Sequence, residues 1–180
     1  DKEDLTSIKN YSEVENIEIK NLKIGVCEEL VGDGISEEVN THFSNTIEEL
    51  KKLGAKIEYV SVPYIKESLP VYYLTAPSEA SSNLNRYDGI KYGLSQNKYD
   101  NSWEVIKNTR SNFGEEVKRR ILLGTFALSS GYYDQYYGKA QKVRGMIVNS
   151  FKKIFGDYNI LISPTSPITA FGLGAMIDDP

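Results

Sequence analysis

The sequence predicts an α/β fold, with a β-sheet flanked by helices and a helix-rich middle. Three observations support this class. A strand, a helix and a second strand follow one another within residues 22–62, helical patterns fill most of residues 70–155, and a last strand-like run lies at 159–163. Strand, helix and strand at this spacing form a βαβ unit, in which a crossover helix lets two parallel strands pair.

The βαβ unit is defined by alternation, caps and a helical stripe. Residues 22–27 and 56–62 alternate enough to form short strands, and a proline ends the second. Ser36 is a suitable N-cap for the helix between them, because two glutamates follow in the first turn, where the helix dipole favours them. Gly54 ends this helix. The apolar residues at helical spacing are Val39, Phe43, Ile47, Leu50 and Leu53.

Beyond the second strand the chain is predicted to be mostly helical before one more strand. The expected helices span residues 70–85, 103–109, 113–130 and 132–155. Gly156 is the expected cap of the last one. The strand at 159–163 ends at the loop Pro164-Thr165-Ser166-Pro167, because proline cannot donate to a ladder. Loops at such strand ends often face a binding site in α/β proteins.

Composition limits the class of protein. The 180 residues are 40% hydrophobic, enough for one sizeable core, and no run approaches the roughly 20 apolar residues of a membrane span. The net charge of −4 argues against direct nucleic-acid binding, which needs clustered lysine and arginine. We expect a single partial domain over residues 1–180, with residues 1–21 as an extended or loop lead-in. The polar opening from Asp1 indicates a piece of a longer protein.

Few residues offer metal or nucleophile chemistry. Cys27 is the one cysteine, which excludes an internal disulfide, and its place after an apolar strand predicts a buried, inert thiol in a cytoplasmic protein. His42 is the one histidine and lies off the helical stripe, so we expect it in solvent rather than in catalysis. The pair Asp178-Asp179 has no matching ligand set. We therefore expect no metal site and no bound cofactor in this chain.

Residues 71–93 combine tyrosines, small hydroxyl side chains and charges more densely than an ordinary surface helix does. This composition predicts the wall of a polar pocket. Ser81-Ser82 could suggest a nucleophile, but no histidine or lysine stands in an activating arrangement. A role in helix packing is the better interpretation of the two serines.

Arg120 is the charged residue whose position is least ordinary. Successive helix residues are about 100° apart, so the run Lys118-Arg119-Arg120 cannot share one face. Projection places Arg120 on the inward stripe and Arg119 on the opposite side, and Gly124 leaves room one turn later. A half-buried guanidinium needs a carboxylate. Two sources remain open: a ligand, or an internal salt bridge with a residue such as Glu79 or Asp88.

Several long motifs in order resemble the amidase signature family, and within it the branch that releases ammonia from glutamine to amidate glutamyl-tRNA(Gln). The motifs are Tyr72 to Gly93, Gly114 to Arg120, Gly124 to Asp134, and Pro164-Thr165 with Ala170-Phe171, together with Asp4 to Ser7 and Lys23 to Val26. The resemblance implies the middle-to-C-terminal part of an amidase-signature fold, with a mixed sheet wrapped by helices.

The resemblance also implies which roles the chain holds. The family's catalytic lysine and two serines lie in a glycine- and serine-rich signature that this sequence does not contain, so we expect no catalytic residue here and no glutamine hydrolysis by these residues alone. The matching positions imply that Arg120 binds the substrate carboxylate and that Tyr72 lies against the substrate. A further family carboxylate would follow Pro180.

The partners are implied in the same way. The branch works in bacterial translation as a heterotrimer, in which a B subunit uses ATP and Mg²⁺ and a small C subunit binds the pair. Exposed apolar edges left by a partial fold would favour self-association. Two alternatives remain: another amidase signature hydrolase acting on a different amide, or a non-catalytic module that docks a partner through the helix at 132–155 and the acidic surface.

Overall fold

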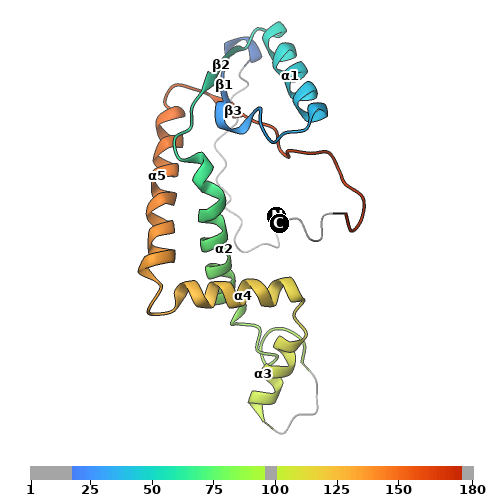
Figure 1. The fold of residues 1–180 in the computed structure, drawn as a ribbon, viewed down its shortest axis with the longest axis vertical. Coiled ribbons are helices and arrows are strands. Elements are labelled where there is room, and N and C mark those ends of the chain that lie inside the picture. The colour runs from blue at the N-terminus through green and yellow to red at the C-terminus, as the bar shows by residue number, and fades with distance from the viewer. Residues whose placement is uncertain (1–17, 96–100, 176–180) are drawn as a thin grey trace. The chain divides into compact units, whose positions relative to one another are not determined.

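The computed structural model describes residues 18–95 and 101–175, and its contacts divide the chain into two compact units. Unit 1 consists of two separate segments, 1–61 and 153–180, and unit 2 consists of 62–152. Figure 1 labels the helices and strands of both. The single partial domain expected from the sequence stays a prediction. Of the expected lead-in, only residues 18–21 are described, and there Ile19–Asn21 form a short 3-10 turn, η1.

Unit 1 is built on a three-stranded parallel sheet. Its strands are β1 (Lys23–Cys27), β2 (Lys56–Val60) and β3 (Ile160–Ile162), in the order β2-β1-β3. The central strand holds the core, with Ile24 and Val26 buried. The α/β class and the βαβ unit are confirmed. The described strands all run parallel, whereas the resemblance implied a mixed sheet, so an antiparallel strand is not among the residues that the structure describes.

Helix α1 (Glu37–Lys52) connects β1 to β2 and begins at the predicted cap. The Ser36 hydroxyl accepts a hydrogen bond from the Val39 amide at 3.4 Å, and Gly54 follows the helix with a positive φ of 93°. Ile47 is the fully buried member of the predicted stripe, while Leu53 is exposed. A short 3-10 turn, η2 (Glu28–Leu30), lies between β1 and this helix.

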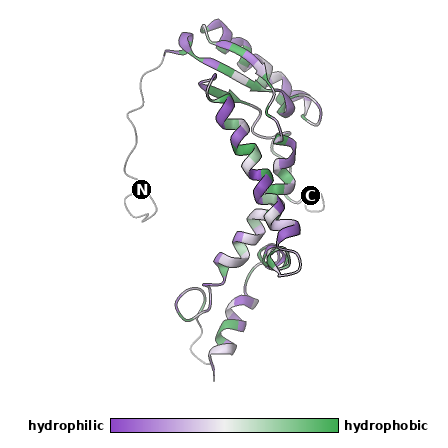
Figure 2. Cartoon of the chain, turned by 90° about the vertical axis from the view of Figure 1, so that its left-hand side faces the viewer, coloured by the Kyte–Doolittle hydropathy of each residue, from purple (hydrophilic) through white to green (hydrophobic). Residues whose placement is uncertain are grey.

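Unit 2 is helical. Its elements are η3 (Ile65–Glu67), α2 (Ser68–Leu84), α3 (Ser102–Ser111), α4 (Glu115–Leu128), η4 (Asp134–Gly138) and α5 (Lys139–Ile154), the last of which ends in unit 1. Figure 2 shows hydrophilic and hydrophobic residues interspersed along the helices, as expected of amphipathic helices. Within the described residues, none of the helices is long and apolar enough to cross a membrane.

The predicted helix at 132–155 is wrong in its first part, because the structure places a π-helix, η4, before α5. The Gly138 amide donates to the Tyr133 carbonyl at 2.8 Å, five residues back, which widens the turn. Aromatic packing accompanies the widening. The rings of Tyr132 and Tyr136 lie 4.5 Å and 5.9 Å from that of Phe126, and Tyr133 packs on Tyr137.

Helices α2 and α4 come into close contact at Gly124, four residues after Arg120. A β-carbon built on Gly124 would lie 2.0 Å from the Pro77 carbonyl oxygen and 2.8 Å from the Ser78 amide nitrogen. Backbone therefore meets backbone at this crossing, which only glycine permits. Ala127, one turn further along α4, is buried on the same side.

Candidate functional site

The first turns of α4 bring three charged side chains together. Residues three and four positions apart are neighbours on a helix surface, so Glu116 reaches both arginines that follow it. Arg119 donates to Glu116 from Nε to Oε2 at 2.7 Å and from Nη2 to Oε1 at 2.9 Å, which is a bidentate pair. Arg120 donates from Nε to the same Oε1 at 2.7 Å. One carboxylate therefore holds two guanidinium groups.

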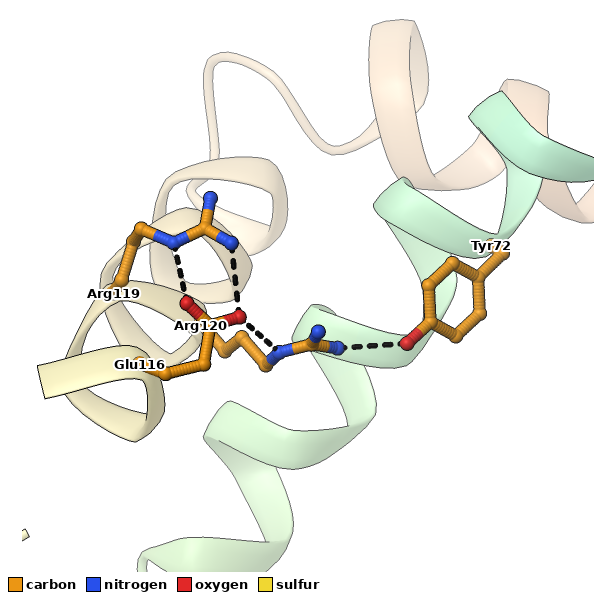
Figure 3. Close-up of polar contacts among 4 residues, drawn as sticks. All are labelled: Tyr72, Glu116, Arg119 and Arg120. Atoms are coloured by element: carbon orange, nitrogen blue, oxygen red, sulfur yellow. Dashed lines mark hydrogen bonds and ion pairs between the residues drawn. The ribbon is translucent and has the colours of Figure 1, made fainter. Parts of the chain in front are cut away.

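Tyr72 on α2 completes the cluster from the other helix. The Arg120 Nη1 group donates to the Tyr72 hydroxyl at 2.8 Å, across 48 residues of sequence (Figure 3). The Arg120 guanidinium carbon lies 5.9 Å from the centre of the Tyr72 ring, within reach of a cation–π attraction. The structure thus brings together both predicted site residues.

Arg120 is half-buried, as its inward projection predicted, and it forms an internal salt bridge, but not with either of the two carboxylates given as examples. Its carboxylate is Glu116 on its own helix, not Glu79 or Asp88. Asp88 instead accepts hydrogen bonds from the backbone amides that follow it in a turn. Helical projection only considers partners on facing helices or strands. It leaves out a partner four residues away on the same helix, which here is Glu116.

The internal salt bridge does not use all of the Arg120 donors. Its Nε and Nη1 groups are engaged, whereas Nη2 has no hydrogen-bond partner within residues 18–95 and 101–175. The side chain as a whole is 34% exposed, so it is not sealed off from solvent. A planar guanidinium with free donors at its end suits an incoming carboxylate.

The charges of the cluster are fixed at neutral pH. The pKa of the Glu116 carboxyl falls to about 2, first because Arg119 donates hydrogen bonds to it and then because Arg120 does. The pKa of Arg120 is raised by the hydrogen bond to Tyr72 and by Glu116. Glu116 and Arg119 are not among the site residues predicted from the sequence. The signal for them is a glutamate placed three and four residues before two successive arginines.

The predicted polar pocket wall is only partly right. Three residues of the 71–93 stretch, Ser81, Leu84 and Asn85, line a groove of about 280 Å³, but the wall across from them is largely apolar. Those opposing residues are Phe113, Ile121 and Leu122, with Arg110 and Lys118. The small hydroxyls of Thr75, Ser78 and Ser81 donate to carbonyls of their own helix, Ser81 to the Ser78 carbonyl at 3.0 Å. This supports the packing interpretation for Ser81, whereas Ser82 is exposed.

The other candidate groups lie where the sequence placed them. Cys27 is buried, and burial, followed by the neighbouring Glu29, raises the pKa of its thiol to about 11. His42 is exposed on α1. In the described part of the chain, no three His, Cys, Asp or Glu side chains are grouped as metal ligands. The pair Asp178-Asp179 lies outside the described residues, so the expectation of no metal stays a prediction.

Comparison with known sequences gives a consistent result over the whole chain. The sequence pattern of the family described as "Amidase" matches residues 1–180. The A subunit of glutamyl-tRNA(Gln) amidotransferase from Staphylococcus epidermidis (strain ATCC 12228) is 54% identical over 164 residues, which is 91% of this chain and 34% of that protein. The protein of the same description from Staphylococcus aureus (strain JH9) is 52% identical over the same length. The chain spans about a third of the length of these curated relatives.

Solved structures give the same fold. The crystal structure of the A subunit of glutamyl-tRNA(Gln) amidotransferase from Thermotoga maritima matches with a TM-score of 0.66 and 37% identity, covering 99% of this chain and 35% of that one. A bacterial aryl acylamidase of the amidase signature family matches with a TM-score of 0.54 at 14% identity, covering 82% of this chain and 29% of that one, a likeness of fold alone.

Proposed function

The chain belongs to the amidase family, and from this premise we propose that it forms the middle-to-C-terminal part of the glutaminase subunit of a tRNA-dependent amidotransferase. In this role the complete subunit releases ammonia from glutamine, and the ammonia converts glutamyl-tRNA(Gln) to glutaminyl-tRNA(Gln). The similarity to proteins described as the A subunit of glutamyl-tRNA(Gln) amidotransferase supports this branch of the family.

Within that subunit, Arg120 binds the α-carboxylate of glutamine and Tyr72 lies beside it. The observation that carries this assignment is the guanidinium held at two nitrogens, by Glu116 and by Tyr72, with Nη2 left for a ligand. A carboxylate that approaches the Nη1 and Nη2 end can form charge-assisted hydrogen bonds, which are about twice as strong as neutral ones. Arg120 and Tyr72 are therefore substrate-binding residues rather than catalytic ones.

The remaining chemistry belongs to other parts of the assembly. No match to the lysine and two serines of the family's catalytic signature occurs in these residues, so they do not hydrolyse glutamine by themselves. The glutaminase works in the cytoplasm with a B subunit, which uses ATP and Mg²⁺, and with a small C subunit. Nucleic acid is bound by these partners, in keeping with the net charge of −4 on this chain.

One observation favours a second role for helix α4, as a docking surface. Three large apolar residues of α4 are exposed: Leu122 at 71%, Leu123 at 44% and Phe126 at 49%. Exposed apolar clusters of this kind are typical of contact surfaces between proteins or between parts of one protein. Binding of the B and C subunits, compared with binding of glutamine, separates this role from substrate recognition.

The test uses the complete subunit in its assembly, with Arg120→Ala and ammonia release as the readout. Loss of a charge-assisted contact to the substrate should lower kcat/KM for glutamine by on the order of 10². Lys118→Ala is the matched control, because Lys118 is a neighbouring cation of α4 that pairs with Glu115 outside the cluster. An unchanged kcat/KM in Arg120→Ala would refute the assignment.

The substrate itself provides a second control. Glutamine α-methylamide carries a neutral amide in place of the carboxylate, so its turnover should be low in the wild type and insensitive to Arg120→Ala. An equal loss for both substrates would mean that Arg120 acts through folding rather than through the carboxylate.

A further inference from the structure

We propose that Glu116 positions Arg120 for the substrate carboxylate and that Arg119 supplies the positive charge that Glu116 would otherwise cancel. The proposal rests on the proposed function of Arg120 and adds two residues to it. Neither one needs to touch the substrate: Glu116 acts through Arg120, and Arg119 acts through Glu116.

The positioning role follows from where the guanidinium is held. An arginine side chain is long and flexible, and its free rotation must be lost before it can bind a ligand in one geometry. Here Nε is fixed by Glu116 at 2.7 Å, and Nη1, at the far side of the plane, is fixed by Tyr72 at 2.8 Å (Figure 3). Two contacts from two helices define the plane of the group. The ordering cost is therefore met before the substrate arrives.

The charge role follows from the net charge of Glu116, Arg119 and Arg120. Glu116 and Arg120 alone form a neutral pair, and a neutral pair offers little attraction to an anion. Arg119 adds a second cation through its bidentate contact at 2.7 Å and 2.9 Å. The three side chains then carry one net positive charge, which matches the single negative charge of a carboxylate. Glu116 can orient Arg120 without repelling the substrate.

A neighbouring pair shows what an ordinary surface salt bridge looks like on the same helix. Glu115 and Lys118 are also three residues apart and meet at 2.9 Å, and Glu115 is 92% exposed. Exposed pairs of this kind contribute little to stability. Glu116 differs because its carboxylate reaches the residue that contacts a second helix. Variants of Glu115 and Lys118 are therefore matched controls for variants of Glu116 and Arg119.

The experiment measures KM and kcat for glutamine in the complete assembled enzyme, with three single variants and one double variant of Glu116 and Arg119, beside Arg120→Ala and two control variants. Glu116→Ala removes the acceptor for Nε and should raise KM about tenfold with a smaller change in kcat. Glu116→Gln keeps an oxygen for Nε–H, so KM should stay within about threefold of the wild type. Arg119→Ala leaves a neutral pair and should raise KM several-fold.

The double variant Glu116→Gln with Arg119→Ala distinguishes the charge role most clearly from a structural one. It restores one net positive charge, on Arg120, and keeps the acceptor for Nε–H, so its KM should fall back toward the wild-type value. A salt bridge with only a structural role predicts no such rescue. The Glu115→Ala and Lys118→Ala controls should leave KM unchanged, and none of the variants should change turnover of the neutral α-methylamide.

The outcomes separate the two proposals. A normal KM in Arg120→Ala overturns the proposed function and with it this inference. A raised KM in Arg120→Ala beside a normal KM in Glu116→Ala overturns the inference alone. Equal KM increases in Glu116→Ala and Glu116→Gln contradict positioning through the Nε acceptor. A double variant that is worse than Arg119→Ala contradicts the charge count.

Discussion

Substituting Gly124 with alanine should drive α2 and α4 apart. The new β-carbon would lie 2.0 Å from the Pro77 carbonyl oxygen and 2.4 Å from its carbonyl carbon. A relaxed carbon–oxygen contact measures about 3.3 Å or more, so the backbones must separate by roughly 1 Å. Neither atom belongs to a flexible side chain that could turn away, so the helices themselves must move.

Two opposing terms set the magnitude. Overpacking of a tight contact costs about 1–3 kcal/mol, while alanine in place of glycine favours a helix interior by about 0.5–1 kcal/mol. The net destabilisation should therefore be on the order of 1 kcal/mol, and at most about 2.5 kcal/mol. Arg120 lies one turn before Gly124, and its 2.8 Å contact with Tyr72 spans the same two helices. The KM for glutamine should rise together with the loss of stability.

The control is a helical glycine with space around it. Gly145 lies inside α5, and a β-carbon there would meet no atom of residues 18–95 or 101–175 within 4 Å. Gly145→Ala should therefore stabilise the complete subunit by about 0.5–1 kcal/mol. The assay is thermal unfolding of both variants beside the wild type, with hydrogen exchange in α2 and α4. If Gly124→Ala proved as stable as Gly145→Ala, the close approach of the two helices would be wrong.

Three further predictions concern single side chains. The pKa of Glu116 is lowered from 4.5 to about 2, so its contribution to stability should be present above pH 4.5 and lost as the pH falls toward 2. Thermal unfolding against pH should show the wild type losing its advantage over Glu116→Gln across that window; a constant difference would contradict the hydrogen bonds from the arginines. The pKa of the Cys27 thiol is raised to about 11, so only roughly one thiol in a thousand is ionised at pH 8, and alkylation of the folded protein should be far slower than that of the unfolded one. Rapid labelling of folded protein would show that the thiol is accessible after all. Tyr72→Phe keeps the ring but removes the hydroxyl that holds Nη1, so KM should rise several-fold, whereas Tyr73→Phe should leave it unchanged. Equal effects of the two substitutions would argue against a specific role for the Tyr72 hydroxyl.

Local rules predicted the helices and strands well, because hydrophobic periodicity, capping residues and helix-breaking residues act within a few positions. The Ser36 cap and the parallel pairing of β1 and β2 follow from such signals. The π-helix did not, since five residues are too few to distinguish its period from that of an α-helix. The polar wall was only partly right, for another reason. The hydroxyls of Thr75, Ser78 and Ser81 bond to carbonyls of their own helix, so they add no polarity to a pocket.

The substrate-binding roles of Arg120 and Tyr72 stay predictions, whereas the position of Arg120 could be compared with the structure. The inward position of Arg120 follows from helical projection, which depends only on geometry. Its partner required a choice among several carboxylates, and projection does not rank them. The i,i+4 neighbour was present in the sequence, and its reach along the same helix is a local rule that could have identified it.

The two-segment construction of unit 1 has a consequence for the order of folding. The Lys23 amide donates to the Asn159 side chain, 136 residues away, and the Asn159 amide donates back to the Lys23 carbonyl. During synthesis β1 can pair with β2 early, whereas β3 emerges only after the whole of unit 2. One edge of β1 therefore stays open until late, and the entropy of closing so long a loop delays its completion.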